Sequence, residues 1–167
     1  MDWDSRSFTL SHDPAQTSQE AIFETIKGLG FKPSDTPLSE ADQGKELSKT
    51  ELARLDVKTI SKGKTFAFAD HMVAGKITIF DYYADWCGPC LVLSRELETL
   101  SIERGDIAIR KADLIDWKSE LAKHLTKTYK LPGIPYLRIY GPDGKLLGTV
   151  GKNDIDAVKA LLPPVTK

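Results

Sequence analysis

The clearest hydrophobic pattern in the chain is a nearly continuous apolar run over residues 77–83, Ile-Thr-Ile-Phe-Asp-Tyr-Tyr. A run with so few polar interruptions predicts a central strand that is buried on both faces. Apolar positions at helical spacing follow closely and predict a helix over residues 89–101. A strand that leads directly into a helix therefore occupies the middle of the chain.

The remainder of the C-terminal part repeats these two patterns. Short apolar runs predict strands over 65–69, 107–112, 136–140 and 146–150, the last two joined by the turn sequence Gly-Pro-Asp-Gly. Apolar positions at helical spacing predict helices over 117–129 and 154–162. Together these elements predict an α/β fold in which helices flank both faces of a mixed sheet.

The N-terminal part has a different organisation. We expect a short strand over 8–11 and an amphipathic helix over 18–29, which form a helical and extended appendage in residues 1–33. One strand and one helix bury little surface by themselves. Residues 34–62 are polar and charged and predict a linker, with one short helix over 49–55. The main domain is expected to cover residues 63–167.

Composition narrows the classes of function. The chain has 23 basic and 24 acidic residues and a net charge of −1, which gives no reason to expect nucleic-acid binding. It has no apolar run long enough to span a bilayer, and its acidic first residues are unlike a secretory signal. We therefore expect a cytoplasmic protein as the chain stands, or a periplasmic or envelope one if the chain is an excised domain.

Cys87 and Cys90 are the two cysteines of the chain, and they lie where the central strand gives way to the helix. A structural disulfide would close too short a loop to restrict the unfolded chain much. Half of a zinc site would need two further ligands, and His12, His71 and His124 are scattered without paired spacing. A redox-active dithiol explains the pair better.

The local chemistry supports this interpretation. At the first turn of a helix, unpaired N–H groups and the macrodipole favour the Cys87 thiolate, which is the nucleophile. Cys90, one turn further in, suits the resolving role. Gly88 permits a tight turn, Pro89 is tolerated in a first helical turn, and Trp86 is expected to cover the pair.

The segment 80–90, Phe-Asp-Tyr-Tyr-Ala-Asp-Trp-Cys-Gly-Pro-Cys, resembles the active-site segment of thioredoxins. Further matches follow in order at Lys111, at Gly-Ile-Pro 133–135, at Asp-Gly 143–144 and at Val-Gly 150–151. The resemblance covers about residues 64–163. It implies a thioredoxin-like fold and a thiol-disulfide oxidoreductase that reduces protein disulfides and is itself re-reduced by an upstream thiol reductant.

The resemblance also implies roles for single residues. Asp81 would be a buried carboxylate that accepts the proton of Cys90 through water, and Lys111 would pair with it. Pro135 would follow a cis peptide bond, so that the backbone at Ile134 pairs with an extended substrate segment. No organic cofactor is implied, because the redox-active disulfide of Cys87 and Cys90 carries the electrons.

The chain departs from the thioredoxin pattern beside the expected substrate groove. A short insertion lies within residues 113–120, and Leu91, Arg95 and Tyr136 stand where the family has other residue types. These changes leave the dithiol chemistry unaltered but put the identity of the partner in doubt. The opening Tyr-Ala-Asp-Trp-Cys and the insertion are also similar to thioredoxin-like domains of membrane-linked thiol reductases in bacterial envelopes.

Residues 8–31 resemble the second half of heavy-metal-associated domains, without the half that carries their metal-binding cysteine pair. This resemblance leaves two alternatives open. One is a metal-handling module that binds Cu(I) or zinc through Cys87 and Cys90, since soft thiolates select such metals. The other is a reductase dedicated to the cysteines of a metal chaperone or transporter, as part of a larger metal-related or envelope system.

Overall fold

A computed structural model describes residues 10–28, 33–35, 47–131 and 133–165 of the chain. The chain divides into two units, residues 1–45 and residues 46–167, which are described separately.

The described part of the first unit contains one helix, α1 (Gln19–Gly28). The Ser18 hydroxyl accepts a hydrogen bond from the Ala21 backbone N–H, as an N-cap residue does. This confirms the predicted helix, apart from residue 29, which lies outside the described residues. Of the predicted strand over 8–11, residues 8 and 9 also lie outside them, and residues 10 and 11 are not in a strand.

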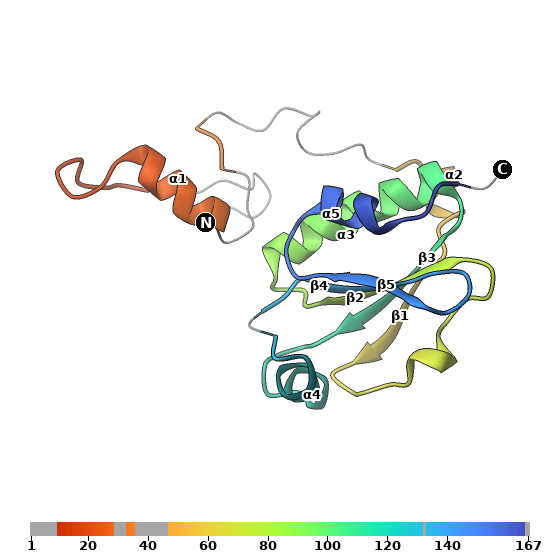
Figure 1. The fold of residues 1–167 in the computed structure, drawn as a ribbon. Helices are drawn as coiled ribbons and strands as arrows, with labels where there is room; N and C mark the ends of the chain where they lie inside the picture. Colours follow the sequence, from red (N-terminus) through yellow and green to blue (C-terminus); the bar gives the residue numbers. More distant parts are fainter. Residues whose placement is uncertain (1–9, 29–32, 36–46, 132, 166–167) are drawn as a thin grey trace. The chain divides into compact units, whose positions relative to one another are not determined.

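The second unit is built on a five-stranded sheet with the order β1-β3-β2-β4-β5 (Figure 1). Its strands are β1 (Val57–Lys62), β2 (Ile77–Tyr83), β3 (Ile107–Asp113), β4 (Tyr136–Tyr140) and β5 (Leu146–Val150). β1, β3 and β2 run parallel to one another, β4 runs antiparallel to β2, and β5 runs antiparallel to β4. This is the predicted mixed sheet, with the fully buried β2 at its centre.

Helices cover both faces of the sheet (Figure 1). α3 (Gly88–Arg104) and α5 (Ile155–Leu161) pack over Ile77 and Ile79 of β2. α4 (Glu120–Tyr129) and the short 3₁₀ helix η1 (Phe68–Asp70) pack over Phe80 and Tyr82. Successive side chains of a strand point to opposite faces, so β2 supplies both halves of the core. Asp81 therefore shares the face of Ile79, under α3.

The first strand of the sheet is not the predicted segment 65–69 but β1, within the residues that we expected to end the linker. β1 lies at the edge of the sheet, and half of its residues are exposed and polar, which gives it the composition of a linker. Phe66 and Phe68 show strand-like alternation because both rings pack against Phe80. The prediction for 65–69 was wrong because aromatic packing produces the same alternation as a strand.

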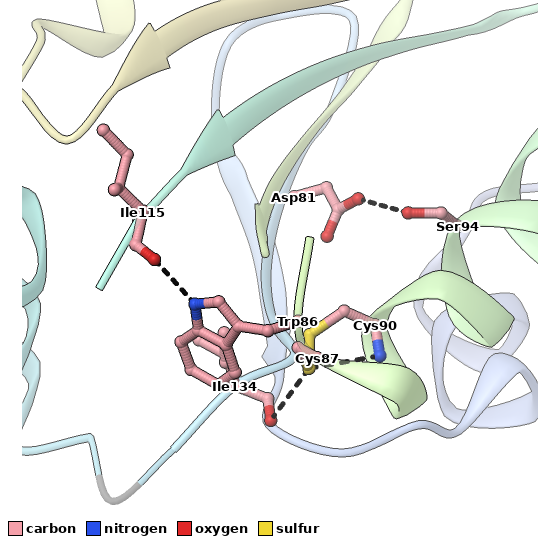
Figure 2. Close-up of a disulfide and its surroundings, with 7 residues drawn as sticks. All are labelled: Asp81, Trp86, Cys87, Cys90, Ser94, Ile115 and Ile134. Carbon is pink, nitrogen blue, oxygen red and sulfur yellow. Dashed lines mark hydrogen bonds between the residues drawn. A yellow bond between two sulfur atoms is a disulfide. The ribbon is translucent and has the colours of Figure 1, made fainter. Parts of the chain in front are cut away.

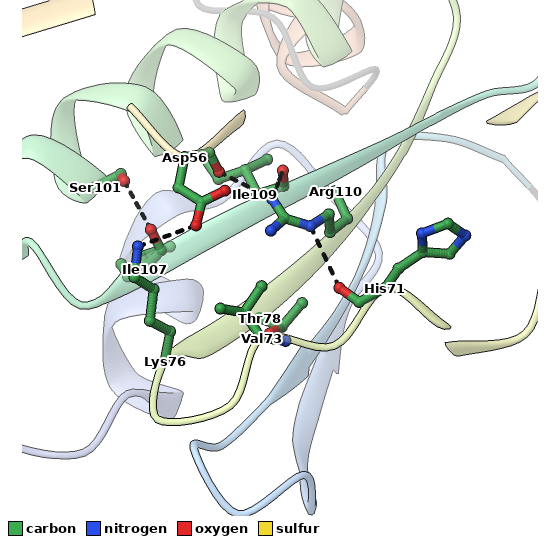
Figure 3. Close-up of polar contacts among 9 residues, drawn as sticks. All are labelled: Asp56, His71, Val73, Lys76, Thr78, Ser101, Ile107, Ile109 and Arg110. Atoms are coloured by element: carbon green, nitrogen blue, oxygen red, sulfur yellow. Dashed lines mark hydrogen bonds and ion pairs between the residues drawn. The ribbon is translucent and has the colours of Figure 1, made fainter. Parts of the chain in front are cut away.

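Charged side chains hold the edge of the sheet in place (Figure 3). The Arg110 side chain is buried in β3 and forms an ion pair with Asp56, at 2.8 Å, just before β1. Its guanidinium also donates to the backbone oxygens of Asp56 and His71. Lys76, just before β2, binds the second oxygen of the Asp56 carboxylate at 3.0 Å. The cluster ties the segments just before β1 and β2 to the middle of β3.

Helix ends follow local capping chemistry. A capping box of Ser48 and Glu51 opens α2 (Lys49–Leu52), which is shorter than the predicted helix over 49–55. Ser119 caps α4, so this helix begins three residues later than predicted, and α3 continues past residue 101 until the left-handed Gly105 ends it. Among the described helices, none has the length and apolarity needed to cross a membrane.

Candidate active site

Cys87 and Cys90 form a disulfide where the end of β2 meets the start of α3 (Figure 2). Cys87 is the N-cap of α3, and Gly88 and Pro89 make its first turn. The backbone N–H of Cys90 donates to the Cys87 sulfur at 3.3 Å. In the reduced protein, this donor and the positive end of the helix would stabilise a negative charge on Cys87. The strand and the helix thus create an electropositive position for one sulfur.

The two sulfurs differ in access. Cys87 is 6% exposed, whereas Cys90 is completely buried. The Ile134–Pro135 peptide bond is cis, as the resemblance implied, and the Ile134 carbonyl oxygen lies 3.8 Å from the Cys87 sulfur. Cys87 is therefore the less buried of the two cysteines, and the backbone at Ile134 lies beside its sulfur.

Asp81 is a buried acid beneath the disulfide. Its side chain is 1% exposed, and the Ser94 hydroxyl of α3 donates to its Oδ2 at 3.0 Å. Its Oδ1 is buried and accepts no hydrogen bond from the described protein. Figure 2 shows one carboxylate oxygen turned to Ser94 and the other turned to the side of the disulfide. One oxygen is therefore held, and the other is available to take a proton.

Burial raises the pKa of Asp81 from 3.8 to about 6. The positive charge of Lys111 and the hydrogen bond from Ser94 oppose this rise, and the negative charge of Glu98 adds to it. The pKa of Asp81 therefore lies close to neutral pH, where a carboxylate can both accept and release a proton.

Lys111 is paired with Asp81 in the register of β3 and β2. Its ammonium group lies over the Tyr83 ring, 4.4 Å from the centroid, and within the described structure no ion pair joins it to the Asp81 carboxylate. The predicted direct pairing is thus replaced by a cation–π contact with Tyr83. Lys111 acts on Asp81 through its charge alone.

Trp86 is 52% exposed beside the disulfide. Its indole N–H donates to the Ile115 carbonyl oxygen at 2.6 Å, in the loop that corresponds to the predicted insertion. The Trp117 ring from the same loop lies 6.4 Å from the Trp86 ring, centroid to centroid. Trp86 therefore stands beside the disulfide, fixed to this loop.

The structure brings all the predicted site residues to this end of the sheet, and it adds Ser94 and Ile115, which sequence reasoning missed. Ser94 lies seven positions after Cys87 on the buried face of α3, a spacing that could have identified it as a partner for a buried acid. Ile115 acts through its backbone, which leaves no signal in the sequence. No group of three or more metal-ligating side chains occurs among the described residues, so the metal-handling alternative has no further ligands there.

The thioredoxin family model matches residues 56–163 of the chain. Thioredoxin from Chlamydia trachomatis is 30% identical over 95 residues, which cover 57% of this chain and 87% of that protein. Thioredoxin from Coprinus comatus is 33% identical over 82 residues, covering 48% of this chain and 73% of that protein. The crystal structure of Chlamydomonas reinhardtii thioredoxin f2 has 24% identity and a TM-score of 0.47, and covers 62% of this chain and 93% of that one.

The resemblance of residues 8–31 to heavy-metal-associated domains lies outside the match to the family model and stays a prediction. The match itself extends over well over half of the sequence and contains the disulfide, the buried acid and the cis-proline. The chain belongs to the thioredoxin family.

Proposed function

We propose that the chain reduces disulfides in other proteins through Cys87 and Cys90. The observation that carries this proposal is the asymmetry of the pair. Cys87 caps a helix and keeps 6% of its surface exposed, whereas Cys90 is completely buried. An accessible, electropositive sulfur suits nucleophilic attack, and a buried one suits resolution.

The reaction starts from the dithiol form. The Cys87 thiolate attacks one sulfur of the partner's disulfide, and the other sulfur leaves as a thiolate and takes up a proton. Cys90 then loses its proton and attacks Cys87, which breaks the mixed disulfide and releases the partner's second thiolate. Two electrons pass to the partner, the Cys87–Cys90 disulfide forms, and an upstream dithiol reductant must return those electrons.

Asp81 takes the proton of Cys90 in this scheme. Its free Oδ1 and a pKa of about 6 favour this role near neutral pH. Ser94 holds the other oxygen and so sets the direction of the carboxylate. Lys111 contributes its charge from the neighbouring strand.

The backbone before Pro135 receives the partner. The Ile134 carbonyl oxygen stands 3.8 Å from the Cys87 sulfur, so a chain that presents its disulfide to Cys87 lies against it. An extended segment can pair with such a backbone in the way that a peptide adds to a sheet edge. Trp86, Gly88 and Pro89 form the rest of this contact surface.

Trapping of the mixed disulfide tests the proposal. Cys90→Ser should form a covalent adduct with insulin through Cys87, seen on a non-reducing gel and located by mass spectrometry. Cys87→Ser is the matched control and should form none. Adducts formed by Cys87→Ser alone would reverse the two roles, and adducts formed by neither variant, with no insulin reduction by the wild type, would refute the function.

A further inference from the structure

Arg138 is surrounded by aromatic side chains on the face of the sheet that α4 and η1 cover. It lies in the middle of β4, between Tyr136 and Tyr140, and strand alternation puts all three side chains on that face. The guanidinium carbon lies 4.6 Å from the centroid of the Tyr129 ring, 5.3 Å from that of Phe68 and 5.8 Å from that of Tyr140. We name Arg138 and these aromatic residues the arginine cage.

The cage uses only part of the hydrogen-bonding capacity of Arg138. Nε donates to the Tyr140 hydroxyl and Nη1 donates to the Tyr136 hydroxyl, each at 3.2 Å. A guanidinium carries N–H donors on all of its nitrogens. Nη2 has no hydrogen-bond acceptor among the described residues. Because the two hydroxyls accept these bonds, each can still donate its own proton to a further acceptor.

The partners of Arg138 differ from those of the other shielded arginines in the described part of the chain. Arg104 pairs with Asp106 at 2.9 Å, and Arg110 pairs with Asp56 at 2.8 Å. No carboxylate among the described residues forms an ion pair with Arg138. A shielded charge is ordinarily paired, because moving an unpaired charge out of water is costly. Arg138 therefore has rings and hydroxyls where the other two have a carboxylate.

A tyrosine could balance this charge only as a phenolate, which ordinarily forms at about pH 10. Burial raises the pKa of Tyr129 above its ordinary value of 10.0, although the charge of Arg138 opposes the rise. Burial also raises the pKa of Tyr82, whose ring centroid lies 5.8 Å from that of Tyr136. At neutral pH, neither Tyr82 nor Tyr129 therefore supplies a negative charge to Arg138.

We propose that the arginine cage is a binding site for one carboxylate group. Nη2 of Arg138 and the hydroxyls of Tyr136 and Tyr140 place donors from three side chains around a single charge. One cation suits a carboxylate, which carries one negative charge, better than a phosphate monoester, which carries nearly two at neutral pH. The site lies next to the rim of the sheet, because Arg138 is paired in register with Thr149 of the edge strand β5, and Thr149 is exposed. A small acid and an acidic side chain of another protein both carry this group.

This site is separate from the dithiol. Asp81 is hydrogen-bonded to Ser94 of α3, on the face of β2 that carries Ile79. Arg138 is paired with Phe80 in the register of β4 and β2, and it lies on the opposite face. The inference therefore goes beyond the proposed function, and reduction of insulin does not depend on it.

Titration of the isotope-labelled, oxidised chain with sodium acetate, followed by NMR, tests this proposal. The Nε–H signal of Arg138, identified by its loss in Arg138→Lys, should shift and reach saturation. The backbone amide signal of Thr149, the register partner of Arg138, should follow the same curve. Sodium chloride at the same ionic strength should give no saturable shift at either position, because screening alone does not depend on the geometry of the anion.

Arg138→Lys keeps the charge but loses the planar guanidinium and its fork of donors. Measured at the Thr149 amide, acetate should bind this variant about tenfold more weakly, which is the effect of losing a charge-assisted hydrogen bond. Arg104→Lys is the matched control, because it makes the same change at a shielded arginine that already pairs with Asp106. Its affinity for acetate should equal that of the wild type. Both variants should reduce insulin at the wild-type rate.

A second titration identifies the source of the carboxylate. A short peptide with blocked ends and one central glutamate should shift the same signals as acetate does. A peptide affinity about tenfold or more above that of acetate would assign the site to an acidic side chain of another protein. Equal affinities would assign it to a small acid.

Several results would overturn the proposal. Shifts that grow linearly with acetate, or that chloride reproduces, would show that the rings and hydroxyls around Arg138 serve packing alone. Tighter binding of inorganic phosphate than of acetate would show that the class of anion is wrong. Unchanged affinity in Arg138→Lys would place the binding elsewhere, and loss of insulin reduction in that variant would make the arginine part of the reductase. A wild type that binds acetate but reduces no insulin would refute the proposed function and leave this site standing.

Discussion

Replacing Asp81 with asparagine should change the stability of the oxidised protein, relative to the wild type, by an amount that grows more favourable as pH rises. In the unfolded chain the carboxyl ionises with a pKa of 3.8, but burial in the folded protein raises that pKa to about 6. The folded state therefore holds the proton more tightly than the unfolded state does. Its stability falls as pH rises from about 4 to about 6, and the loss is complete above that range.

The size of this loss follows from the two pKa values. A displacement from 3.8 to about 6 corresponds to about 3 kcal/mol, at about 1.4 kcal/mol for each pH unit. The Asp81→Asn variant has no carboxyl group to ionise at this position, so its free energy of unfolding does not fall in this way as pH rises. Its amide N–H groups also need acceptors, and each one left without an acceptor costs about 1–3 kcal/mol at every pH. The advantage of Asp81→Asn over the wild type should therefore grow by about 2.5 kcal/mol between pH 4 and pH 8.

Denaturant unfolding of the oxidised wild type and of Asp81→Asn, measured from pH 4 to pH 8, gives this difference directly. Asp85→Asn is a matched control, because it removes a carboxylate from an exposed position in the same segment. Its difference from the wild type should vary far less with pH. A difference for Asp81→Asn that stays flat, or that shrinks as pH rises, would refute a buried acid with a raised pKa.

Three further substitutions test other parts of the structure by denaturant unfolding. Ser94→Ala removes the hydrogen bond to Asp81 and should raise the pKa of that acid further. The substitution should cost about 2 kcal/mol of stability at pH 8 and less at pH 5. An equal loss at both pH values would contradict this. Asp56→Ala leaves the Arg110 side chain buried without its partner and should cost about 3 kcal/mol at pH 7. Burial alone would raise the pKa of Asp56, but hydrogen bonds from Arg110 and Lys76 outweigh it and lower that pKa, so the loss should fade as pH drops below 3.8. Ser119→Ala removes the N-cap of α4 and should cost about 1 kcal/mol, and an unchanged midpoint would show that this cap contributes nothing.

Several parts of the fold could be predicted because they depend on local patterns. The apolar run of β2, the helical spacing of α3 and the hairpin of β4 and β5 each lie within a few consecutive residues. β1 could not be recognised, because its edge position and its polar outer residues conceal it. It pairs with β3, and the ion pair between Asp56 and Arg110 beside this pairing joins residues 54 positions apart.

The sequence by itself determined where the dithiol lies and which cysteine begins the helix, because a strand, a helix start and the spacing of two cysteines are all local features. Only the tertiary structure decided the environment of that dithiol. Ser94 reaches Asp81 across 13 positions, and Ile115 reaches Trp86 across 29. The raised pKa of the acid and the anchoring of Trp86 beside the disulfide both arise from such contacts. Burial and hydrogen bonding depend on which distant segments pack together, and that is settled only when the chain folds.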